Sequence, residues 1–449
     1  MFFVGIDVAK RKHEAVVIDD KGRIVQKSFS FPNSLSGYNS LISCVKRITS
    51  TRKDIVFGME STSHYWLALY SHLIKDGYTA HVINPIQSDA FRGLFIRQTK
   101  TDPIDAVIIA EVIRFGKYSS THFPQHKILA LREMCRNRLY MVDAISDLKR
   151  KTIALIDQVF PEYDQLFSDT FLVSSIEVLY RYPTPKKLLH IRRNTLTNLL
   201  IKTSGGHFGS AKADEIIHAA KNTFGIDDPY DVYADLIQTF IKQIKFIQKN
   251  VAEIDQKITA IMDEIASPIT SIPGIGVTLG AVILSEIGDI SRFKSADKLA
   301  AFAGIDPSLK QSGDYSSIRN HMSKRGSPYL RRALWMACIP ATQVDPMFRA
   351  YYLKKRSEGK SHMKTMGHVA KKMICVIYAV LRDIIGIISD TFIRDSYVDE
   401  KGYLHFTENV SNYRKKIADE AFSLMGEPYN EWNRQGISIW DFNRSFAGE

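Results

Sequence analysis

Four acidic residues in the first quarter of the chain have the types and spacing that metal-dependent chemistry on phosphate requires. Two of them each end a short apolar, β-prone run, so their side chains are expected at the ends of strands. The other two lie three residues apart at the start of a third apolar segment. Pro103 favours a first helical turn there, which would place both carboxylates on one helical face. The four residues are Asp7, Glu60, Asp102 and Asp105.

Such a set of carboxylates repels itself unless cations neutralise it. Hard oxygen ligands suit Mg²⁺, with Mn²⁺ as an alternative, and do not suit Zn²⁺. Two such ions roughly 3.5–4 Å apart are a known device for phosphoryl transfer on nucleic acid. The sequence therefore predicts a magnesium-dependent active site. The plainer alternative is that the four are unrelated surface or helix-capping carboxylates.

The elements that would position these residues form a recognisable order. A turn signal at Asp19–Gly22 separates the second and third of three strands that run as an antiparallel meander. Helices and strands then alternate. This order is typical of the ribonuclease-H-like α/β fold, in which the first strand carries an essential aspartate and a later helix the last carboxylates. The expected strands are 2–7, 14–18, 23–31, 54–59 and 79–83, with helices at 36–49 and 65–75.

Composition favours a folded protein with a polyanionic partner. The chain has 449 residues, 45% of them hydrophobic and 24% charged, and a net charge of +12. This length predicts more than one domain, and the charge favours nucleic acid. No apolar run reaches bilayer length and no signal peptide is evident, so we expect a cytoplasmic protein that associates with the nucleoid during its reaction. The cysteines are widely spaced and predict buried thiols: Cys44, Cys135, Cys338 and Cys375.

Two long segments have apolar residues that alternate by three and four. One extends from Leu131 to Val159, with polar interruptions at Arg138 and Thr152, and the other from Ile237 to Ile265. This alternation predicts either a coiled-coil seam, within or between chains, or long core helices of a bundle. Between them, residues 166–230 suggest short helices without identifiable chemistry.

The last third contains features suited to phosphate. The turn Pro273–Gly276 joins two apolar helical runs, as in a helix-hairpin-helix, where Gly274 and Gly276 would offer backbone N–H groups to a nucleic-acid backbone. Further on, Ser327 and Pro328 predict the start of a helix. Four basic residues crowd this start and predict a phosphate clamp, although a solvated basic face is the alternative. They are Lys324, Arg325, Arg331 and Arg332.

In these motifs and their order, the chain resembles the DEDD-type transposases of bacterial insertion sequences, the "one-ten" family. The resemblance covers residues 1–115 and 265–390 best. It rests on Gly5–Lys10, Glu60–Thr62, Lys100–Ala106, Pro273–Gly276, Gln311–Gly313 and Ser323–Arg331.

The resemblance implies a RuvC-like N-terminal domain that binds Mg²⁺ and a C-terminal transposase domain. Members of the family excise and integrate an insertion sequence, guided by a structured RNA encoded by the element that pairs with donor and target DNA. A serine is the proposed nucleophile, which gives a covalent protein–DNA intermediate, and active sites are thought to be composite within a tetramer. Matched by motif, the serine is Ser312, with Ser308, Ser316 and Ser317 nearby.

We therefore expect a RuvC-like catalytic domain at 1–125, a helical coiled-coil region at 126–266, a mainly α transposase domain at 267–395 and an extension at 396–449. The expected partners are donor and target DNA, a guide RNA and further copies of the chain, from dimer to tetramer. The main alternative is a resolvase-like endonuclease that uses activated water in place of Ser312. An actin-like sugar kinase is disfavoured because Val8–Lys12 lacks a small-residue phosphate loop. A non-catalytic scaffold would have no use for the carboxylates.

Overall fold

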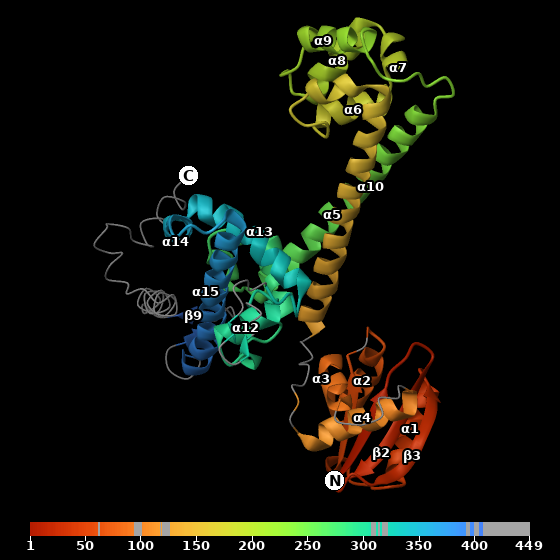
Figure 1. Cartoon of the computed structure of the whole chain (residues 1–449), viewed down its shortest axis with the longest axis vertical. Coiled ribbons are helices and arrows are strands. Elements are labelled where there is room, and N and C mark those ends of the chain that lie inside the picture. Colours follow the sequence, from red (N-terminus) through yellow and green to blue (C-terminus); the bar gives the residue numbers. More distant parts are fainter. Residues whose placement is uncertain are drawn as a thin grey trace, which may run out of the picture. The chain divides into compact units, whose positions relative to one another are not determined.

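The computed structural model describes residues 1–61, 63–93, 101–116, 118, 126–306, 311–312, 315–316, 322–391, 396–398 and 404–406. For residues 126, 311–312, 315–316 and from 383 onward, this description is of the backbone alone. The chain divides into two compact units, Met1–Phe123 and Pro124–Glu449 (Figure 1). The four-part division expected from the sequence is finer, and its inner boundaries remain predictions. The expected extension at 396–449 lies outside the described residues except for 396–398 and 404–406.

The first unit is an α/β domain built on one five-stranded mixed sheet in the order β3-β2-β1-β4-β5. The first three strands form the predicted antiparallel meander, and β4 and β5 are added in parallel beside β1. Helix α1 (Leu35–Lys46) begins at an N-cap serine, Ser34. The strands are β1 (Phe2–Asp7), β2 (Lys12–Asp19), β3 (Ile24–Pro32), β4 (Ile55–Glu60) and β5 (Thr79–Ile83), and the other helices are α2 (Trp66–Lys75), α3 (Pro85–Arg92) and α4 (Asp102–Phe115).

Helix α4 packs directly on the sheet because two strand glycines leave room for it. A Cβ atom on Gly5 would lie 2.0 Å from the carbonyl oxygen of Ala106, and one on Gly58 would lie 2.8 Å from the side chain of Ile113. The helix therefore lies close along β1, with Ala106 and Ala110 over Gly5 and with Ile113 toward Gly58 of β4. This close approach sets where the first turn of α4 lies relative to the ends of the strands.

The second unit contains a long antiparallel hairpin of two helices, α5 (His126–Val159) and α10 (Val232–Ile265) (Figure 1). Ion pairs join them in antiparallel register, with Arg138 Nε 2.5 Å from Asp255 Oδ1 and Lys127 Nζ 2.6 Å from Glu264 Oε2. The two alternating apolar patterns thus pack against each other within one chain. Coiled-coil geometry and pairing between chains remain predictions.

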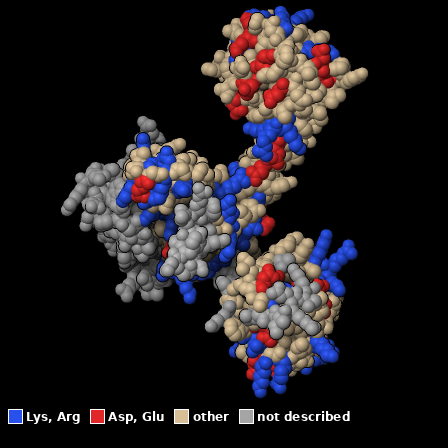
Figure 2. Space-filling view, viewed as in Figure 1, with Lys and Arg blue, Asp and Glu red and all other residues tan. Residues whose placement is uncertain are grey.

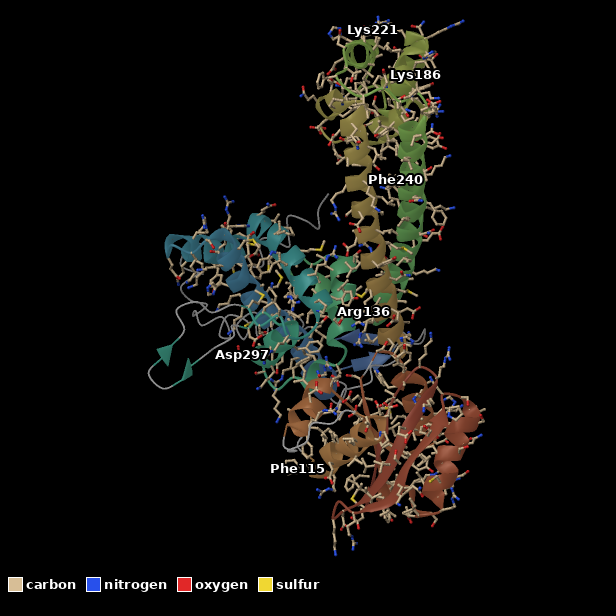
Figure 3. The ribbon with its side chains drawn as sticks, turned by 45° about the vertical axis from the view of Figure 1, so that its right-hand side comes forward. Phe115, Arg136, Lys186, Lys221, Phe240 and Asp297 are labelled. Atoms are coloured by element: carbon tan, nitrogen blue, oxygen red, sulfur yellow. The ribbon has the colours of Figure 1, made fainter. Side chains whose placement is uncertain are left out.

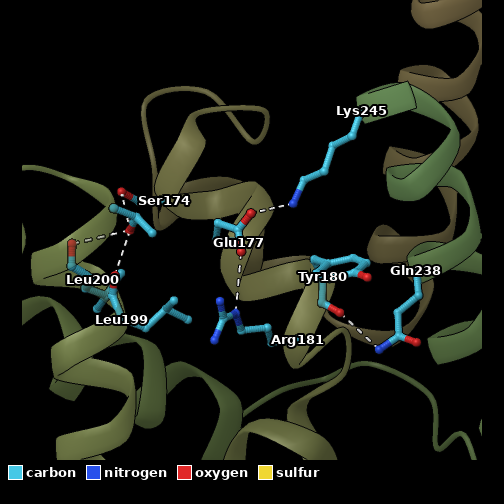
Figure 4. Close-up of polar contacts among 9 residues, drawn as sticks. Ser174, Glu177, Tyr180, Arg181, Leu199, Leu200, Gln238 and Lys245 are labelled. Atoms are coloured by element: carbon cyan, nitrogen blue, oxygen red, sulfur yellow. Dashed lines mark hydrogen bonds and ion pairs between the residues drawn. The ribbon is translucent and has the colours of Figure 1, made fainter. Parts of the chain in front are cut away.

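One end of the hairpin carries four short helices around a core of their own. Glu177 of α6 pairs with Lys245 of α10, and the amide of Gln238 donates to the carbonyl of Tyr180 at 3.0 Å (Figure 4). These contacts attach the short helices to α10. The helices are α6 (Val173–Arg181), α7 (Pro185–Leu189), α8 (Arg193–Thr203) and α9 (Ser210–Lys221).

The other end of the hairpin packs against the carboxyl-terminal helices in a second core that includes Leu131 of α5 and Met262 of α10. Figure 3 places Arg136 at this end of the hairpin, with Lys186 and Lys221 at the opposite end. Among the described residues, no helix is long and apolar enough to span a membrane. The helices are α11 (Val277–Ile287), α12 (Ala296–Ala303), α13 (Pro328–Val344), α14 (Pro346–Ser357) and α15 (His362–Thr391).

Candidate active site

Asp7 and Glu60 end neighbouring parallel strands at the same edge of the sheet. Ile6 of β1 is paired with Met59 of β4, so the next residue of each strand continues the register. Side chains alternate between faces, so Asp7 lies on the face of Gly5 and Glu60 on the face of Gly58, the face that α4 covers. The sheet thus brings the first two predicted carboxylates together beneath the start of α4.

The other two predicted carboxylates lie in the first turn of α4, where proline follows Asp102 as expected. Asp102 is exposed, whereas Asp105 is partly buried and is paired with an arginine side chain. Arg92 Nη1 lies 2.6 Å from Asp105 Oδ1, and each side chain is 13% exposed. This hydrogen bond, against the opposing effect of burial, raises the pKa of Arg92, and the charge of Glu60 contributes in the same direction.

Helix α3 places both Arg92 and a second polar contact at this edge. The helix begins at a capping box formed by Asn84 and Gln87. Ser88 of this helix is buried, and its hydroxyl donates a hydrogen bond to the Glu60 carboxylate. Among the described residues, no three His, Cys, Asp or Glu side chains are gathered closely enough to hold one ion.

Glu14 is a further carboxylate at this edge that sequence reasoning missed. It is the antiparallel partner of Asp7 in β2, and directly opposed side chains lie on one face. Its two carboxylate oxygens accept hydrogen bonds from Ser28 and Ser30 of β3. The predicted turn at Asp19–Gly22 joins β2 to β3 and does not set the register of β2 against β1, so no turn signal in the sequence placed an acidic residue opposite Asp7.

Ser312 lies in a small hairpin of two-residue strands, β6 (Gln311–Ser312) and β7 (Tyr315–Ser316), in which it is paired with Tyr315. Gly313, Ser308 and Ser317 lie outside the described residues. The chain on either side of this segment is held together at its base. The backbone N–H of Lys324 donates to the carbonyl of Gly304 at 3.0 Å, and Ser323 hydrogen-bonds Asp306 through its backbone at 2.9 Å and through its side chain.

The four predicted phosphate contacts have different environments. Lys324 and Arg325 are exposed at the base of the Ser312 segment. Arg331 donates to the carbonyl of Ala303 at 3.1 Å. Both Nη atoms of Arg332 lie 2.7 Å from the carboxylate of Asp143 on α5. The last two therefore have structural partners that no sequence pattern predicted.

The predicted glycine turn is likewise divided. Gly274 has a φ of +83°, and a Cβ atom there would lie 2.3 Å from the carbonyl oxygen of Ala337. The positive φ and the close packing against α13 therefore explain why a glycine stands at this position. A Cβ atom on Gly276 would meet nothing within 4 Å, and this residue is the N-cap of α11. Gly276 is the better placed of the two for a phosphate contact.

A cluster of half-buried arginines surrounds Glu286 of α11, whose own side chain is 4% exposed. Arg136 binds its carboxylate with two hydrogen bonds, at 2.7 and 3.1 Å, and Ser327 donates to it at 2.8 Å. Ser327 also caps α13, as predicted, by accepting from the backbone of Leu330. The cluster therefore ties α5 and α11 to the helix start that follows the Ser312 segment.

Two further arginines give this cluster an excess of positive charge. Arg132 donates to the carbonyl of Ser285 at 2.8 Å. The Arg292 guanidinium lies over Phe293 and Phe302, 4.6 and 4.5 Å from their ring centroids. Its Nε is buried without a hydrogen-bond partner among the described residues. Burial, and then the charge of Arg132, lower the pKa of Arg292 to about 10.

Comparison with known proteins matches both regions. A family described as "Transposase" matches residues 4–161, and one described as "Transposase IS116/IS110/IS902 family" matches residues 266–353. The insertion element IS116 uncharacterized 44.8 kDa protein of Streptomyces clavuligerus is 25% identical, over 85% of this chain and 94% of its own length. The mini-circle putative transposase for IS117 of Streptomyces coelicolor is 23% identical, over 85% and 94%.

The pilin gene-inverting protein of Moraxella bovis is also 23% identical, over 85% of this chain and 95% of its own. The first match contains the carboxylate edge, and the second contains the Ser312 segment, Glu286 and Arg292; Arg132 and Arg136 of the basic cluster lie in the first match. The chain therefore belongs to the IS110/IS116 family of insertion-element transposases, enzymes that act on DNA.

Proposed function

We propose that this transposase excises and integrates its element by Mg²⁺-dependent cleavage and exchange of DNA strands, with Ser312 as the nucleophile. The carboxylate edge of the α/β unit carries the proposal. Its strand order and the position of α4 are those expected of a ribonuclease-H-like domain. The donors are oxygen atoms, and Asp105 already binds a positive group, so the residues fit a hard cation. Asp7, Glu60, Asp102 and Asp105 would hold Mg²⁺, which would stabilise charge on the phosphate.

In the proposed step, Ser312 Oγ forms a bond to phosphorus while the bond from phosphorus to one deoxyribose oxygen breaks. The serine hydroxyl gives up its proton, and the departing oxygen takes one up. The product is a phosphodiester between protein and DNA, so a new strand can later displace the serine without ATP. The carboxylates and Ser312 belong to different compact units of the chain. As in the composite sites that the family resemblance implies, one chain would supply the carboxylates and another chain Ser312.

Denaturing gel electrophoresis of the protein with labelled donor DNA tests this step. The wild type should give a protein–DNA band that survives denaturation, and Ser312→Ala should not. Ser316→Ala, on the paired strand, is the matched control and should retain the band. A band that persists in Ser312→Ala would move the nucleophile elsewhere. Hydrolysed ends without any adduct would favour the resolvase-like alternative, which uses the same carboxylates with activated water.

The basic residues of the second unit support nucleic-acid binding. Figure 2 shows Lys and Arg side chains gathered along the α5–α10 hairpin. Near the Ser312 segment, Lys324 and Arg325 are exposed, and Arg132 and Arg292 add further positive charge. These groups suit the phosphates of donor and target DNA and of a structured guide RNA. Copurification of an element-encoded transcript with the full chain, tested by sequencing bound RNA, would support guidance, and RNA-independent recombination would contradict it.

The middle of the α5–α10 hairpin supports assembly of two to four chains. Its seam residues Ile145, Leu148, Ile247 and Val251 are half-buried, whereas Leu139 and Ile258 nearer one end are buried. Two helices alone leave this apolar strip partly in water, and a second copy would cover it. Sedimentation of the full chain should show a dimer or larger species, which Val251→Glu should weaken. A wild-type monomer at micromolar concentration would contradict this assembly.

A further inference from the structure

Helix α3 brings a cation to the carboxylate edge that the sequence motifs do not contain. Arg92 is the last residue of α3, and its guanidinium is largely enclosed, with 13% of the side chain exposed. Its Nη1 lies 2.6 Å from Asp105 Oδ1, and its Nε lies 3.8 Å from Asp89 Oδ1. The charge of Glu60 also acts on it. Arg92 thus pairs with carboxylates of α3 and α4 at the edge where Glu60 ends β4.

We propose that Arg92 is the resident counter-cation of the carboxylate edge, and that a divalent ion must displace its guanidinium from Asp105 in order to bind there. This inference rests on the proposed metal site and adds a residue that sets how tightly the site holds metal. Arg92 is a positioning residue in this account, because it acts through Asp105.

The chemistry of the carboxylate supports displacement. Mg²⁺ requires oxygen ligands at about 2.0–2.1 Å in near-ideal octahedral geometry. The Oδ1 atom of Asp105 already accepts a short charge-assisted hydrogen bond, so one of its lone pairs is engaged by Arg92. A guanidinium and a divalent ion beside the same carboxylate also repel each other. Metal binding therefore competes with the Arg92–Asp105 pair.

A neighbouring contact shows that α3 also holds a second carboxylate of the edge. Ser88 lies one turn before Arg92 in α3, and its buried hydroxyl donates to Glu60. The same helix thus holds one predicted ligand from β4 and another from α4. While both contacts persist, no described group of three acidic, His or Cys side chains is assembled around one ion. Release of Asp105 by Arg92 would free one ligand to join the others.

The test is Mn²⁺ binding to the full chain, measured by electron paramagnetic resonance of free Mn²⁺ and by calorimetry without DNA. Arg92→Gln should bind Mn²⁺ about tenfold more tightly than the wild type, because it removes a competing partner of Asp105; the size is that of the losses seen when supporting partners of metal ligands are removed, with the opposite sign. Arg114→Gln is the matched control. It removes an ion pair of similar geometry on α4, where Arg114 Nη2 lies 2.6 Å from Glu111 Oε2, away from the site. This control should bind like the wild type.

A double-mutant cycle separates displacement from a general effect on folding. In an Asp105→Asn background, the competing pair is absent, so Arg92→Gln should no longer raise Mn²⁺ affinity. Circular dichroism and thermal unfolding of each variant confirm that the compared proteins are folded. Unchanged or weaker Mn²⁺ binding by folded Arg92→Gln would overturn the inference, as would an equal gain in the Asp105→Asn background. If the wild type and every variant fail to bind Mn²⁺, the proposed metal site itself fails.

Discussion

The carboxylate edge of the α/β unit and the Glu286 cluster of the helical unit are built from the same parts in opposite proportions. Each contains an arginine bound to a carboxylate in a partly or fully enclosed site, Arg92 with Asp105 and Arg136 with Glu286. At the edge, several acidic residues outnumber the arginine. In the cluster, Arg132 and Arg292 add positive charge around one glutamate. The first site is suited to bind cations, and the second is suited to bind a polyanion.

This difference shows how one chain can divide the work on a phosphodiester. Burying a charge is costly unless a group of opposite charge compensates it. An uncompensated excess of charge in a partly buried site therefore indicates that a ligand of opposite charge binds there. Metal ions would complete the edge, and DNA or RNA phosphates would complete the cluster. Substitutions in one site should therefore impair the function of that site and leave the other site unaffected.

Removal of a predicted metal ligand should have the largest effect. Asp7→Asn or Glu60→Gln should reduce strand transfer by about a thousandfold or more, the scale of losing a catalytic group. Asp102→Asn and Asp105→Asn should act in the same direction. Glu111→Gln on α4 is the control, because this glutamate pairs with Arg114 outside the site. Strand transfer near the wild-type rate in two of the four ligand variants would contradict a metal site at the carboxylate edge.

The sequence predicted the strand ends and the helix start that carry the four candidate carboxylates. Asp7 and Glu60 end apolar runs, and Pro103 marks the start of α4, so strand ends and a helix start were predictable from local patterns. Arg92 and Ser88 were not, because α3 contacts the site through tertiary packing and has no motif of its own. Glu14 was not predictable either, because the pairing of β1 with β2 that places it beside Asp7 has no turn signal of its own.

The Glu286 cluster of the helical unit was much less predictable from the sequence. The sequence located a basic helix start at Ser327, and the structure confirms that cap. No local pattern indicated that Arg332 pairs with Asp143, or that Arg136 reaches Glu286, because these partners are separated by well over a hundred residues. Such contacts depend on how α5 packs against α11 and α13. The helix pattern predicted a seam on α5 and could not specify the partner of each charged side chain.

Glu286 is the anion that holds the positive cluster together. Glu286→Ala should lower the free energy of unfolding by about 1–3 kcal/mol, because it removes the charged hydrogen bonds of Arg136, whose side chain is 38% exposed, and leaves the buried Ser327 without its acceptor. Chemical denaturation of the full chain, followed for the helical unit by circular dichroism, measures this loss. Asp255→Ala, which removes the more exposed partner of Arg138, should cost clearly less. Equal losses would mean that the Glu286 cluster has no special structural role.

The two additional arginines should affect nucleic-acid binding more than stability. Arg292→Gln and Arg132→Gln should each weaken DNA binding and reduce the slope of log affinity against log salt by about 0.9 for each phosphate that the variant no longer neutralises. Fluorescence anisotropy over a salt series provides the measurement. Arg193→Gln, at an exposed ion pair with Asp214 in the short helices, should leave the slope unchanged. If Arg292→Gln binds with an unaltered slope, the excess positive charge in this cluster does not bind phosphate.

The smallest effect concerns Arg332, which the sequence suggested as a phosphate contact and the structure pairs with Asp143. The hydrogen bond from Arg332, against a smaller opposing effect of burial, lowers the pKa of the Asp143 carboxyl. A lowered folded-state pKa contributes stability above the unfolded value of about 3.9, and this contribution is lost as pH falls through the folded pKa. Both side chains are more than a third exposed, 39% and 55%, so solvent screening limits the contribution to about 0–1 kcal/mol.

Arg332→Gln should therefore remove a small part of the stability present at neutral pH and should make unfolding slightly less sensitive to acid below about pH 4. Denaturant unfolding between about pH 2.5 and 7 measures this, and Asp143→Asn should have the same effect. If the pair is purely structural, neither variant changes DNA affinity. If Arg332 exchanges Asp143 for a phosphate, Asp143→Asn strengthens DNA binding while Arg332→Gln weakens it. That opposite response would extend the positive cluster along α13, because Arg332 would then join the groups that bind the nucleic-acid backbone.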